Sequence, residues 1–553
     1  MLLETLCALT LSVGSPSPGV TAYQRDVDFV LQKIEQVHPA PYLFVKQSAL
    51  HLEAREIQAT AAQRDPGCRV AQLMKLVAEL KDGHSYVDPI NVPGLEEWFP
   101  LRFYAFPEGI YITSAAPELS ALVGKKVVQI GKLSADEAMR KVLAIQSANN
   151  PRTAQEGTTW LSNAAIANSI GAATGGEMTL RISGSNTETT MHTVKAFKAK
   201  LNDAWMQQGE MFGPRTRGDL QPYLTGFGSR GPLDFRKGDP ALPPHLRYRL
   251  PYFMLEMPDS KLLYFQWNFI QNWGDEDFPH FVARMFQVLD QRPDWRLAID
   301  VRYNSGGNGD LVANVIRQII KRDRFDIPGN LFVIIGRKTF SAAVDFVGEA
   351  KQWTSAIFVG EPTGAGLNAY GDPEEFETPN LHIPFQISTA YHQHGASVDR
   401  SGEFKPDIPA VMHAAQYFVG RDPCLEAIRE GTDLLPIPVL ITQASGQEAA
   451  RALERRRQSW SDVAWYVPFT EHDMNRAGYA ALAAGKITDA IVAFEMNASR
   501  YPSSWNVWDS LGEAQRAAKD IKSAIASYEK SLVLYPGNKN GRDAINDMAK
   551  NGH

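Results

Sequence analysis

Short apolar stretches alternate with amphipathic stretches over residues 261–360, and this alternation constrains the fold more than any other feature of the 553-residue chain. The apolar stretches have the length and composition of buried strands, at 262–267, 297–301, 331–335 and 356–359. Helical stretches separate them, at 278–289, at 311–320 and from Ser341 onward. Strands separated by helices form a largely parallel sheet that is covered on both faces. Ligands bind such sheets at the loops that leave the carboxyl ends of the strands, so we predict an α/β core with a site at that edge.

The chain is too long for one compact core, and about 150 residues per domain gives three or four units. Apolar spacing predicts an N-terminal helical segment at 23–98, followed by a β-rich middle domain at 99–200. Residues 201–250 are rich in Gly, Pro and Arg and are expected to form an insertion. The α/β core then spans 251–430, and a polar linker at 431–465 leads to the C-terminal region.

The C-terminal region, 466–553, repeats itself with a period of 34 residues. Four positions recur in one register: Gly478, Ala490, Phe494 and Pro502 return as Gly512, Ala524, Tyr528 and Pro536. This is the period of tetratricopeptide helix pairs, so we predict an all-α region of such repeats. Two repeats bury little core by themselves, and the arm should therefore dock on its neighbour or bind a protein partner.

Residues 1–22 have the form of an export signal, with an apolar stretch at 6–13, a break rich in Ser, Pro and Gly, and small residues before Ala22. The segment carries Glu4 and no Lys or Arg, although signal peptides normally begin with basic residues. A frayed helical tail or a start codon placed too late is the alternative interpretation. We expect an exported protein, periplasmic or secreted. No apolar run reaches the 18 or more residues of a spanning helix, so no membrane span is expected.

Composition and charge exclude several classes of function. The 56 Lys and Arg against 62 Asp and Glu leave a formal net charge of −6, whereas a nucleic-acid binder carries a basic excess. Three cysteines cannot form a disulfide scaffold, and no Cys/His cluster has zinc-ligand spacing. We therefore expect no metal, no other cofactor and no nucleic-acid partner. Removal of 1–22 would leave Cys68 and Cys424, and the sequence leaves open whether these two pair.

Three short motifs have the residue types of nucleophilic catalysis. Ser341 follows an apolar strand and begins a helix, where free N–H groups favour negative charge, although serine there can also be a plain helix cap. Gly306 and Gly307 follow another strand, and paired glycines let backbone N–H groups approach a ligand, as in an oxyanion site. His84 stands at a helix end, where it is either a C-terminal cap or the base that a serine nucleophile needs.

Taken together and in order, these motifs resemble the tail-specific, or C-terminal-processing, serine protease family. The matching segments are KDGHS at 81–85, DVRYNSGGN at 300–308, TFSAA at 339–343, VGEPTG at 359–364 and KPDIP at 405–409. The resemblance covers roughly residues 24–430 and implies a crotonase- or ClpP-like α/β core with a PDZ-like middle domain. It makes Ser341 the nucleophile, and it assigns the oxyanion donors to the backbone N–H of Ala342 and that of Gly306 or Gly307.

One departure from the family pattern changes the expected mechanism. Classical tail-specific proteases use a Ser–Lys dyad, with the lysine just after the Gly-Glu-x-Thr segment. Gly366 stands at that position here, and no lysine lies between Glu361 and Asp372. The resemblance to the tricorn-like branch, which takes its base from the histidine of the helix-end motif, points instead to His84.

The tricorn-like branch also has an acidic residue late in the core. Asp399 is the first candidate for this residue and Glu403 the second, because both lie just before the KPDIP segment. Lys338, three residues before the expected nucleophile, is a fallback base that we expect to point to solvent.

The sequence thus predicts a serine hydrolase that cleaves peptide or other acyl bonds, with a peptide or small acyl substrate as its partner. Two alternatives stay open. The same fold could be a binding protein for apolar ligands or peptides with an inactive hydrolase core. The repeat arm could also be the functional part, with the core as its scaffold.

Overall fold

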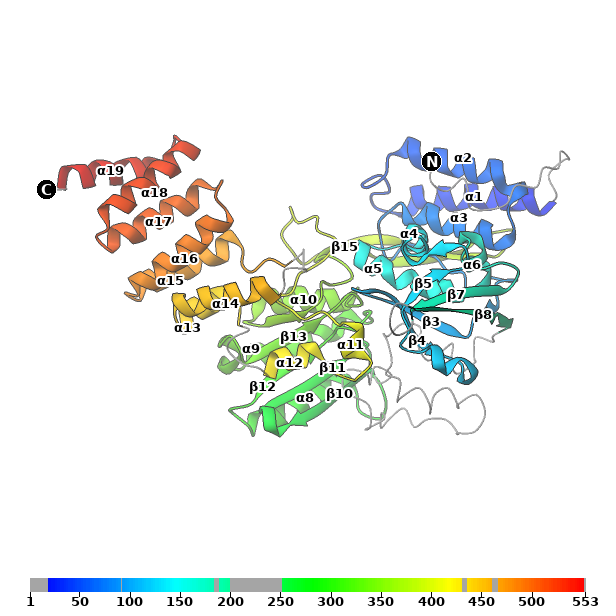
Figure 1. Cartoon of the computed structure of the whole chain (residues 1–553), viewed down its shortest axis with the longest axis horizontal. Helices are drawn as coiled ribbons and strands as arrows, with labels where there is room; N and C mark the ends of the chain where they lie inside the picture. Colours follow the sequence, from blue (N-terminus) through cyan, green and yellow to red (C-terminus); the bar gives the residue numbers. More distant parts are fainter. Residues whose placement is uncertain are drawn as a thin grey trace.

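A computed structural model describes residues 18–90, 92–183, 188–198, 251–429, 435–459 and 466–551. These residues form an N-terminal unit, an α/β core and a C-terminal helical arm, drawn in blue to cyan, green to yellow, and orange to red (Figure 1). The insertion expected at 201–250 and residues 1–17 of the expected export signal lie outside the described residues. Residues 18–22 form the start of the first helix, in which Val20 is buried.

A six-stranded sheet is the centre of the core, with the strand order β10-β11-β12-β13-β14-β17. The strands are β10 (Tyr252–Met257), β11 (Leu262–Trp267), β12 (Arg296–Asp300), β13 (Leu331–Ile335), β14 (Ile357–Gly360) and β17 (Ile408–Pro409). β10 pairs with β11 antiparallel and every other pair is parallel. The predicted parallel sheet is therefore confirmed, with an antiparallel strand added at one edge.

Both faces of this sheet are covered, which explains why its strands are apolar along their whole length. Residues that alternate along the strands, such as Leu263, Phe265 and Leu297, pack with α8 (Phe278–Asp290), α9 (Val312–Ile320) and α10 (Ala342–Trp353). The residues between them, such as Leu262 and Ala298, pack on the opposite face with α12 (Pro423–Arg429) and the start of the helical arm. The period of two along each strand thus divides the core into two layers.

The N-terminal unit begins with α1 (Pro18–Val37), α2 (Gln47–Thr60) and α3 (Pro66–Ala78), so the segment expected to be helical contains helices as far as Ala78 and short strands beyond it. A long hairpin from the core, β15 (Asn368–Glu377) and β16 (Pro384–Gln393), reaches this unit. β16 pairs with β1 (Tyr86–Val87), and Asp26 of α1 accepts hydrogen bonds from the hairpin turn at Asn380 and Leu381. The hairpin therefore ties the two units together beside the segment that carries His84.

The middle segment combines strands with helices, so the expectation of a β-rich domain holds only in part. It contains β2 (Glu97–Trp98), β3 (Leu101–Phe106), β4 (Gly109–Ala115), β5 (Val127–Ile130), β6 (Leu133–Ser134), β7 (Glu177–Ser183), β8 (Thr189–Lys195) and β9 (Phe197–Lys198). Its helices are α4 (Ala135–Ile145), α5 (Pro151–Ala154) and α6 (Ala164–Ile170). Most of its buried residues form one hydrophobic cluster with those of α1–α3, so the N-terminal and middle segments share a core.

The helical arm has a structural repeat that matches the sequence period. α15 (Glu471–Ala483) and α16 (Ile487–Arg500) are followed, 34 residues later at every boundary, by α17 (Trp505–Ala517) and α18 (Ile521–Leu534). A Cβ at Gly478 would lie 2.4 Å from the ring of Phe494, and one at Gly512 3.0 Å from the ring of Tyr528. The recurring glycines therefore let the two helices of each pair approach closely. A final helix, α19 (Lys539–Asn551), follows the second pair.

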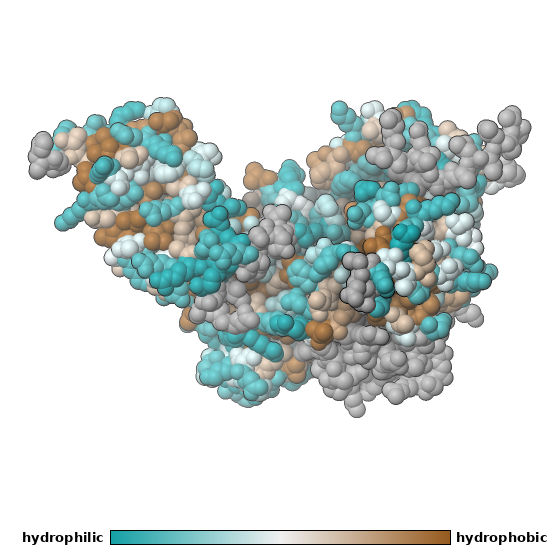
Figure 2. All heavy atoms as spheres, viewed as in Figure 1, coloured by the Kyte–Doolittle hydropathy of each residue, from teal (hydrophilic) through white to brown (hydrophobic). Residues whose placement is uncertain are grey.

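The segment expected as a linker contains two helices, α13 (Ile437–Gln443) and α14 (Gly446–Ser459). Its apolar residues, including Ile437, Leu440 and Ala449, are buried in the cluster that joins the core sheet to the arm. The mostly polar sequence led us to expect a linker, but α14 packs on α13 and α16 with only a few apolar residues. The arm projects from the core, and hydrophobic residues occur in small groups over its visible face (Figure 2).

Within the described residues, no helix combines the length and the apolar composition that crossing a membrane requires. Cys424, on α12, is a buried free thiol. The pairing of Cys68 with Cys424 that the sequence left open is therefore not formed.

Candidate active site

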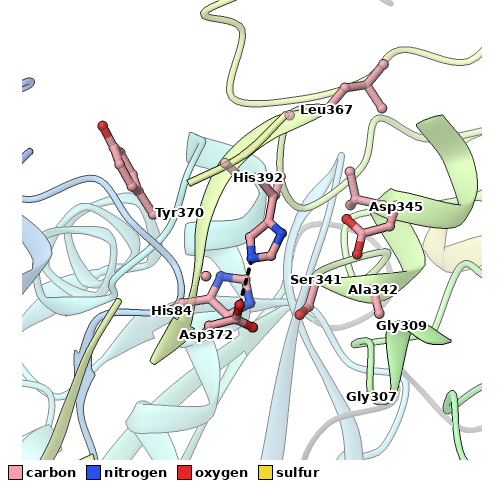
Figure 3. Close-up of a pocket in the computed structure, with 15 residues that line it drawn as sticks. His84, Gly307, Gly309, Ser341, Ala342, Asp345, Leu367, Tyr370, Asp372 and His392 are labelled. Carbon is pink, nitrogen blue, oxygen red and sulfur yellow. Dashed lines mark ion pairs between the residues drawn. The ribbon is translucent and has the colours of Figure 1, made fainter. Parts of the chain in front are cut away.

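Ser341 and His84, which lie 257 positions apart in the sequence, line one pocket at the carboxyl edge of the core sheet (Figure 3). The pocket has a volume of about 150 Å³. The loops after β12, β13 and β14 contribute Gly307, Ser341 and Gly366, and the hairpin contributes Asp372 and His392. The predicted site edge and the predicted meeting of Ser341, His84 and a glycine are thus found in the structure.

Ser341 has the backbone conformation of a strained residue and not that of an ordinary helix cap. Its φ is +52°, in the left-handed region that non-glycine residues rarely adopt. Although it occupies the N-cap position of α10, its hydroxyl makes no capping hydrogen bond. The strain is maintained by the preceding residues, since Phe340 N–H donates to Asn304 O at 3.0 Å and Thr339 Oγ1 to Val301 O at 2.8 Å. Such strain concentrates at functional sites.

Two backbone N–H groups beside Ser341 have no partner among the described residues, namely those of Gly307 and Ala342. Gly306 N–H, in contrast, donates to Asn304 Oδ1 at 2.9 Å. Of the two glycines that the sequence could not separate, Gly307 is therefore the one with a free donor. Gly306 has a steric role, because a Cβ there would lie 2.6 Å from Ser341 Cβ and 3.1 Å from Ala342 N.

His84 lies on the loop between α3 and β1, and its imidazole is held by packing. The ring stacks on Phe340 with centroids 4.3 Å apart. Both ring nitrogens are buried and no side chain among the described residues bonds either of them, while the backbone of Tyr370 is the polar group that favours a proton on the ring. Burial lowers the pKa of His84 below its ordinary value; the charge of Asp82 opposes this shift and that of His392 adds to it. The imidazole is consequently held in its neutral form near pH 7.

Asp82 anchors the loop that carries His84. This carboxylate is fully buried and accepts hydrogen bonds from His84 N–H at 3.0 Å and from the hydroxyls of Ser85 and Ser388 at 2.6 Å each. His38 Nε2 lies 3.5 Å away. Burial alone would raise the pKa of Asp82, but hydrogen bonds from His38, Ser388 and Ser85 hold it below its ordinary value. Asp82 therefore stays ionised and holds the backbone, not the ring, of His84.

The acidic residues chosen from the sequence as partners of His84 do not line the pocket. Asp399 Oδ1 accepts from the N–H of Ser401 at 2.8 Å, and Glu403 lies 3.9 Å from both Arg152 and Lys405. The structure does not bring either carboxylate to the imidazole. Both residues follow β16 on a loop whose path depends on contacts with distant segments, for example Gly402 against Asn149, and sequence order alone could not locate their side chains.

Lys338 does not point to solvent, and that expectation was wrong. Its Nζ lies 2.6 Å from Glu156 in the middle segment, with 13% of the side chain exposed. It lines a second, smaller cavity with Arg337 and Glu361, and not the pocket of Ser341. The ion pair holds the turn before Ser341 against the middle segment.

The pocket also contains residues that the sequence did not single out as site residues. His392 Nε2 lies 3.2 Å from Asp372 Oδ2, and both side chains face the pocket (Figure 3). Asp345, one turn into α10, also lines the pocket and pairs with His394 at 2.9 Å. The only sequence signal was the closeness of His392 and His394. Among the described residues, no three His, Cys, Asp or Glu side chains are arranged to bind a metal.

The Asp300–Arg302 part of the sequence motif is structural. Arg302 is buried and pairs with Asp300 through Nε at 2.9 Å, and with Asp422 through two bonds of 2.9 Å. This paired network fastens the end of β12 to the start of α12, just before the loop that carries the two glycines. A buried arginine with two carboxylates is consistent with the rule that buried charges are paired.

Comparison with solved structures shows which known fold the chain adopts. Mature CPAF complexed with lactacystin matches with a TM-score of 0.51 and 14% identity, over 75% of this chain and 98% of that one. Mature CPAF alone matches with a TM-score of 0.50 and 14% identity, over 75% of this chain and 97% of that one. The photosystem II D1 C-terminal processing protease covers 74% of this chain at 12% identity, but its TM-score of 0.33 is too low to carry an argument.

The first two matches establish the class of fold: most of the described chain is built like CPAF. No protein-family model matches the sequence, and no curated protein is a significant match. At 14% identity these matches show the fold alone, and the crotonase- or ClpP-like core and the PDZ-like middle domain stay expectations.

Proposed function

We propose that this protein is a serine hydrolase of the tail-specific protease type, with Ser341 as nucleophile and His84 as base. One observation carries the proposal. A strained serine, a buried imidazole whose ring no side chain bonds and two free backbone N–H groups line a single pocket. These are the components of acyl transfer: a nucleophile, a base and an oxyanion site.

The reaction follows from the positions of these groups. His84, neutral near pH 7 because of its burial, accepts the hydroxyl proton of Ser341 as the oxygen attacks the substrate carbonyl. The oxyanion accepts hydrogen bonds from the N–H groups of Gly307 and Ala342 at the start of α10. The C–N or C–O bond then breaks, and the leaving group takes the proton from His84. Water hydrolyses the acyl-enzyme by the same steps, with His84 again as base.

No lysine is needed in this scheme. Lys338 is engaged by Glu156 and lines another cavity, which supports a histidine base over a Ser–Lys dyad. The arrangement differs from a Ser-His-Asp triad, because Asp82 bonds the backbone of His84 and not its ring.

We take a peptide as the substrate class, with other acyl compounds as the alternative. Lactacystin, which is bound in one of the CPAF structures, is a useful first probe for this pocket. The export signal at 1–22 and the role of the repeat arm in recruiting a protein partner also stay proposals. The arm buries its first helices against the core, so its natural role in this scheme is to bring partners to the hydrolase.

A fluorophosphonate that reacts with activated serines tests the proposal. The full chain should be labelled with one probe per protein, and Ser341→Ala should remove the label and peptide hydrolysis while circular dichroism stays unchanged. Ser401→Ala is the matched control, because that exposed hydroxyl bonds only the backbone of Glu403, and it should label normally. A folded protein that resists labelling and hydrolyses nothing would favour a binding protein with an inactive core.

A further inference from the structure

An imidazole–carboxylate pair faces His84 inside the same pocket. It consists of His392 on β16 and Asp372 on β15, with Nε2 and Oδ2 3.2 Å apart. The contact places the proton of neutral His392 on Nε2 and leaves Nδ1 with its lone pair. The pair is not part of the scheme above, and neither residue belongs to the motifs that resemble the protease family.

The geometry between the two imidazoles is defined by a glycine. A Cβ at Gly371 would lie 3.2 Å from His392 Nε2, 3.0 Å from His392 Cδ2 and 3.9 Å from His84 Cε1. Both rings therefore flank a single position that has no side chain. A side chain at 371 would press on the His392 ring, which would have to move by a few tenths of an ångström.

The backbone of Asp372 is strained in a way that supports the pair. Asp372 has a φ of +48° in the middle of β15, and its carbonyl accepts a hydrogen bond from Thr389 Oγ1 at 2.6 Å. A strand residue does not need this conformation to continue the sheet. Figure 3 shows the resulting carboxylate directed at His392 within the pocket. Strain at a residue that orients a pocket side chain is typical of functional sites.

The charges around the two imidazoles come from four elements. His84 is faced by Asp82 on its own loop, by Asp345 on α10 and by His392 on β16. His392 is faced by Asp372 on β15 and stacks on His394, with centroids 6.5 Å apart. His394 in turn pairs with Asp345. Negative charges at 82 and 345 favour a proton on His84, whereas the neighbouring imidazole of His392 disfavours one.

We propose that His392, oriented by Asp372, is a positioning residue that faces His84 across Gly371 and keeps that imidazole free to accept a proton. The inference rests on the proposed function only for its kinetic consequence. The protonation of His84 can be measured without turnover, so failure of the hydrolase assignment and failure of this inference are distinguishable.

The test is an NMR titration of the ¹⁵N-labelled histidine rings in the full chain carrying Ser341→Ala. His392→Gln should move the titration midpoint of His84 to higher pH, and His392→Asn, a second uncharged replacement, should move it the same way. His382→Gln is the matched control, since His382 lies on the same hairpin and pairs with Glu377 far from the pocket. An unchanged or lowered midpoint in a folded His392 variant would overturn the proposal.

Two further measurements check the role of Asp372 and the kinetic effect. The Nε2–H tautomer of His392 should predominate in the parent and become a mixture in Asp372→Asn; a mixture already present in the parent would contradict the assigned orientation. With Ser341 restored, the activity of each protein is compared at neutral and at mildly acidic pH. The fall in activity on acidification should be several-fold larger in His392→Gln than in the parent. Equal losses in both proteins would count against the proposal even if hydrolysis itself is confirmed.

Discussion

The imidazole of His84 stacks on the ring of Phe340, with the centroids 4.3 Å apart and the planes 28° apart. Phe340 is the residue before Ser341, and its N–H donates to the carbonyl of Asn304 at 3.0 Å. The ring of Phe340 thus contacts a histidine from the N-terminal unit, while the backbone N–H of Phe340 bonds the loop that carries the two glycines. Gly83 permits the approach, because a Cβ there would lie 2.8 Å from Phe340 Cζ. Packing, and not a carboxylate on the ring, positions this histidine.

Phe340→Leu should therefore lower kcat/KM without unfolding the protein. Leucine fills much of the volume but provides no flat surface for the imidazole, and misplacement of a catalytic group by about 1 Å costs on the order of 10²-fold. Peptide hydrolysis by the purified variant measures the loss. Phe404→Leu is the control and should retain near-normal turnover, since Phe404 makes an edge-to-face contact with Phe358 and does not line the pocket. Equal activity in both variants would show that the stack does not orient His84.

Gly306→Ala should abolish activity, whereas Gly309→Ala should be nearly neutral. Gly306 has a φ of +110°, and its Cβ would lie 2.6 Å from Ser341 Cβ. We expect a cost of roughly 1–3 kcal/mol in the free energy of unfolding and a displaced Ser341. Gly309 has no such conformation, and its Cβ would meet nothing closer than 3.7 Å. Urea denaturation and fluorophosphonate labelling of the two variants provide the comparison, and full labelling of Gly306→Ala would contradict the close packing.

The acid limb of kcat/KM against pH should lie below about 6.5, the ordinary pKa of histidine. Burial lowers the pKa of His84, so the folded protein keeps this imidazole neutral, and able to accept a proton, as the pH falls below 6.5. Activity is lost only when the pH falls through the lowered pKa of His84 in the folded protein. A limb above 6.5, measured with a substrate that does not itself titrate, would exclude His84 as the base.

The same shift makes a contribution to stability with a defined sign. In the unfolded chain His84 binds a proton below about pH 6.5, whereas in the folded protein it binds one only at lower pH. Between these two pKa values the unfolded state therefore binds more protons than the folded state. The contribution to the free energy of unfolding is fully present above 6.5 and is lost as the pH falls through the folded pKa. His84→Gln should remove this component of the pH dependence of urea denaturation.

Local sequence patterns predicted the parts of the fold that local physics determines. The apolar strands β11–β14 and the helices between them were found because strand and helix periods differ, and the 34-residue repeat predicted the paired helices of the arm. Ser341 and the glycine pair were found because each follows a strand that the apolar pattern predicted.

Several features that depend on distant contacts were not predicted, although the meeting of Ser341 and His84 was expected from the resemblance. Gly306 and Gly307 differ only in that the Gly306 amide is taken by Asn304, which no spacing reveals. His392 and Asp372 meet because β15 and β16 pair in a particular register, with Gly371 opposite Ala390. Asp399 and Glu403 were chosen by their order in the chain, but their carboxylates bind other partners. Helices α13 and α14 gain their burial from the core and the arm together.

Lys338→Met separates a histidine base from a lysine base. Lys338 Nζ is paired with Glu156 at 2.6 Å, lines a different cavity from Ser341 and has little exposure. We expect the variant to keep its hydrolytic rate within several-fold. Glu156 would lose this partner but stays near Arg337, at 3.8 Å, so the free energy of unfolding should fall by about 1 kcal/mol. His84→Gln, measured beside it, should lose on the order of 10²–10⁴-fold in rate. If Lys338→Met were as inactive as Ser341→Ala while His84→Gln stayed active, the lysine would be the base, and the pocket around His84 would need another role.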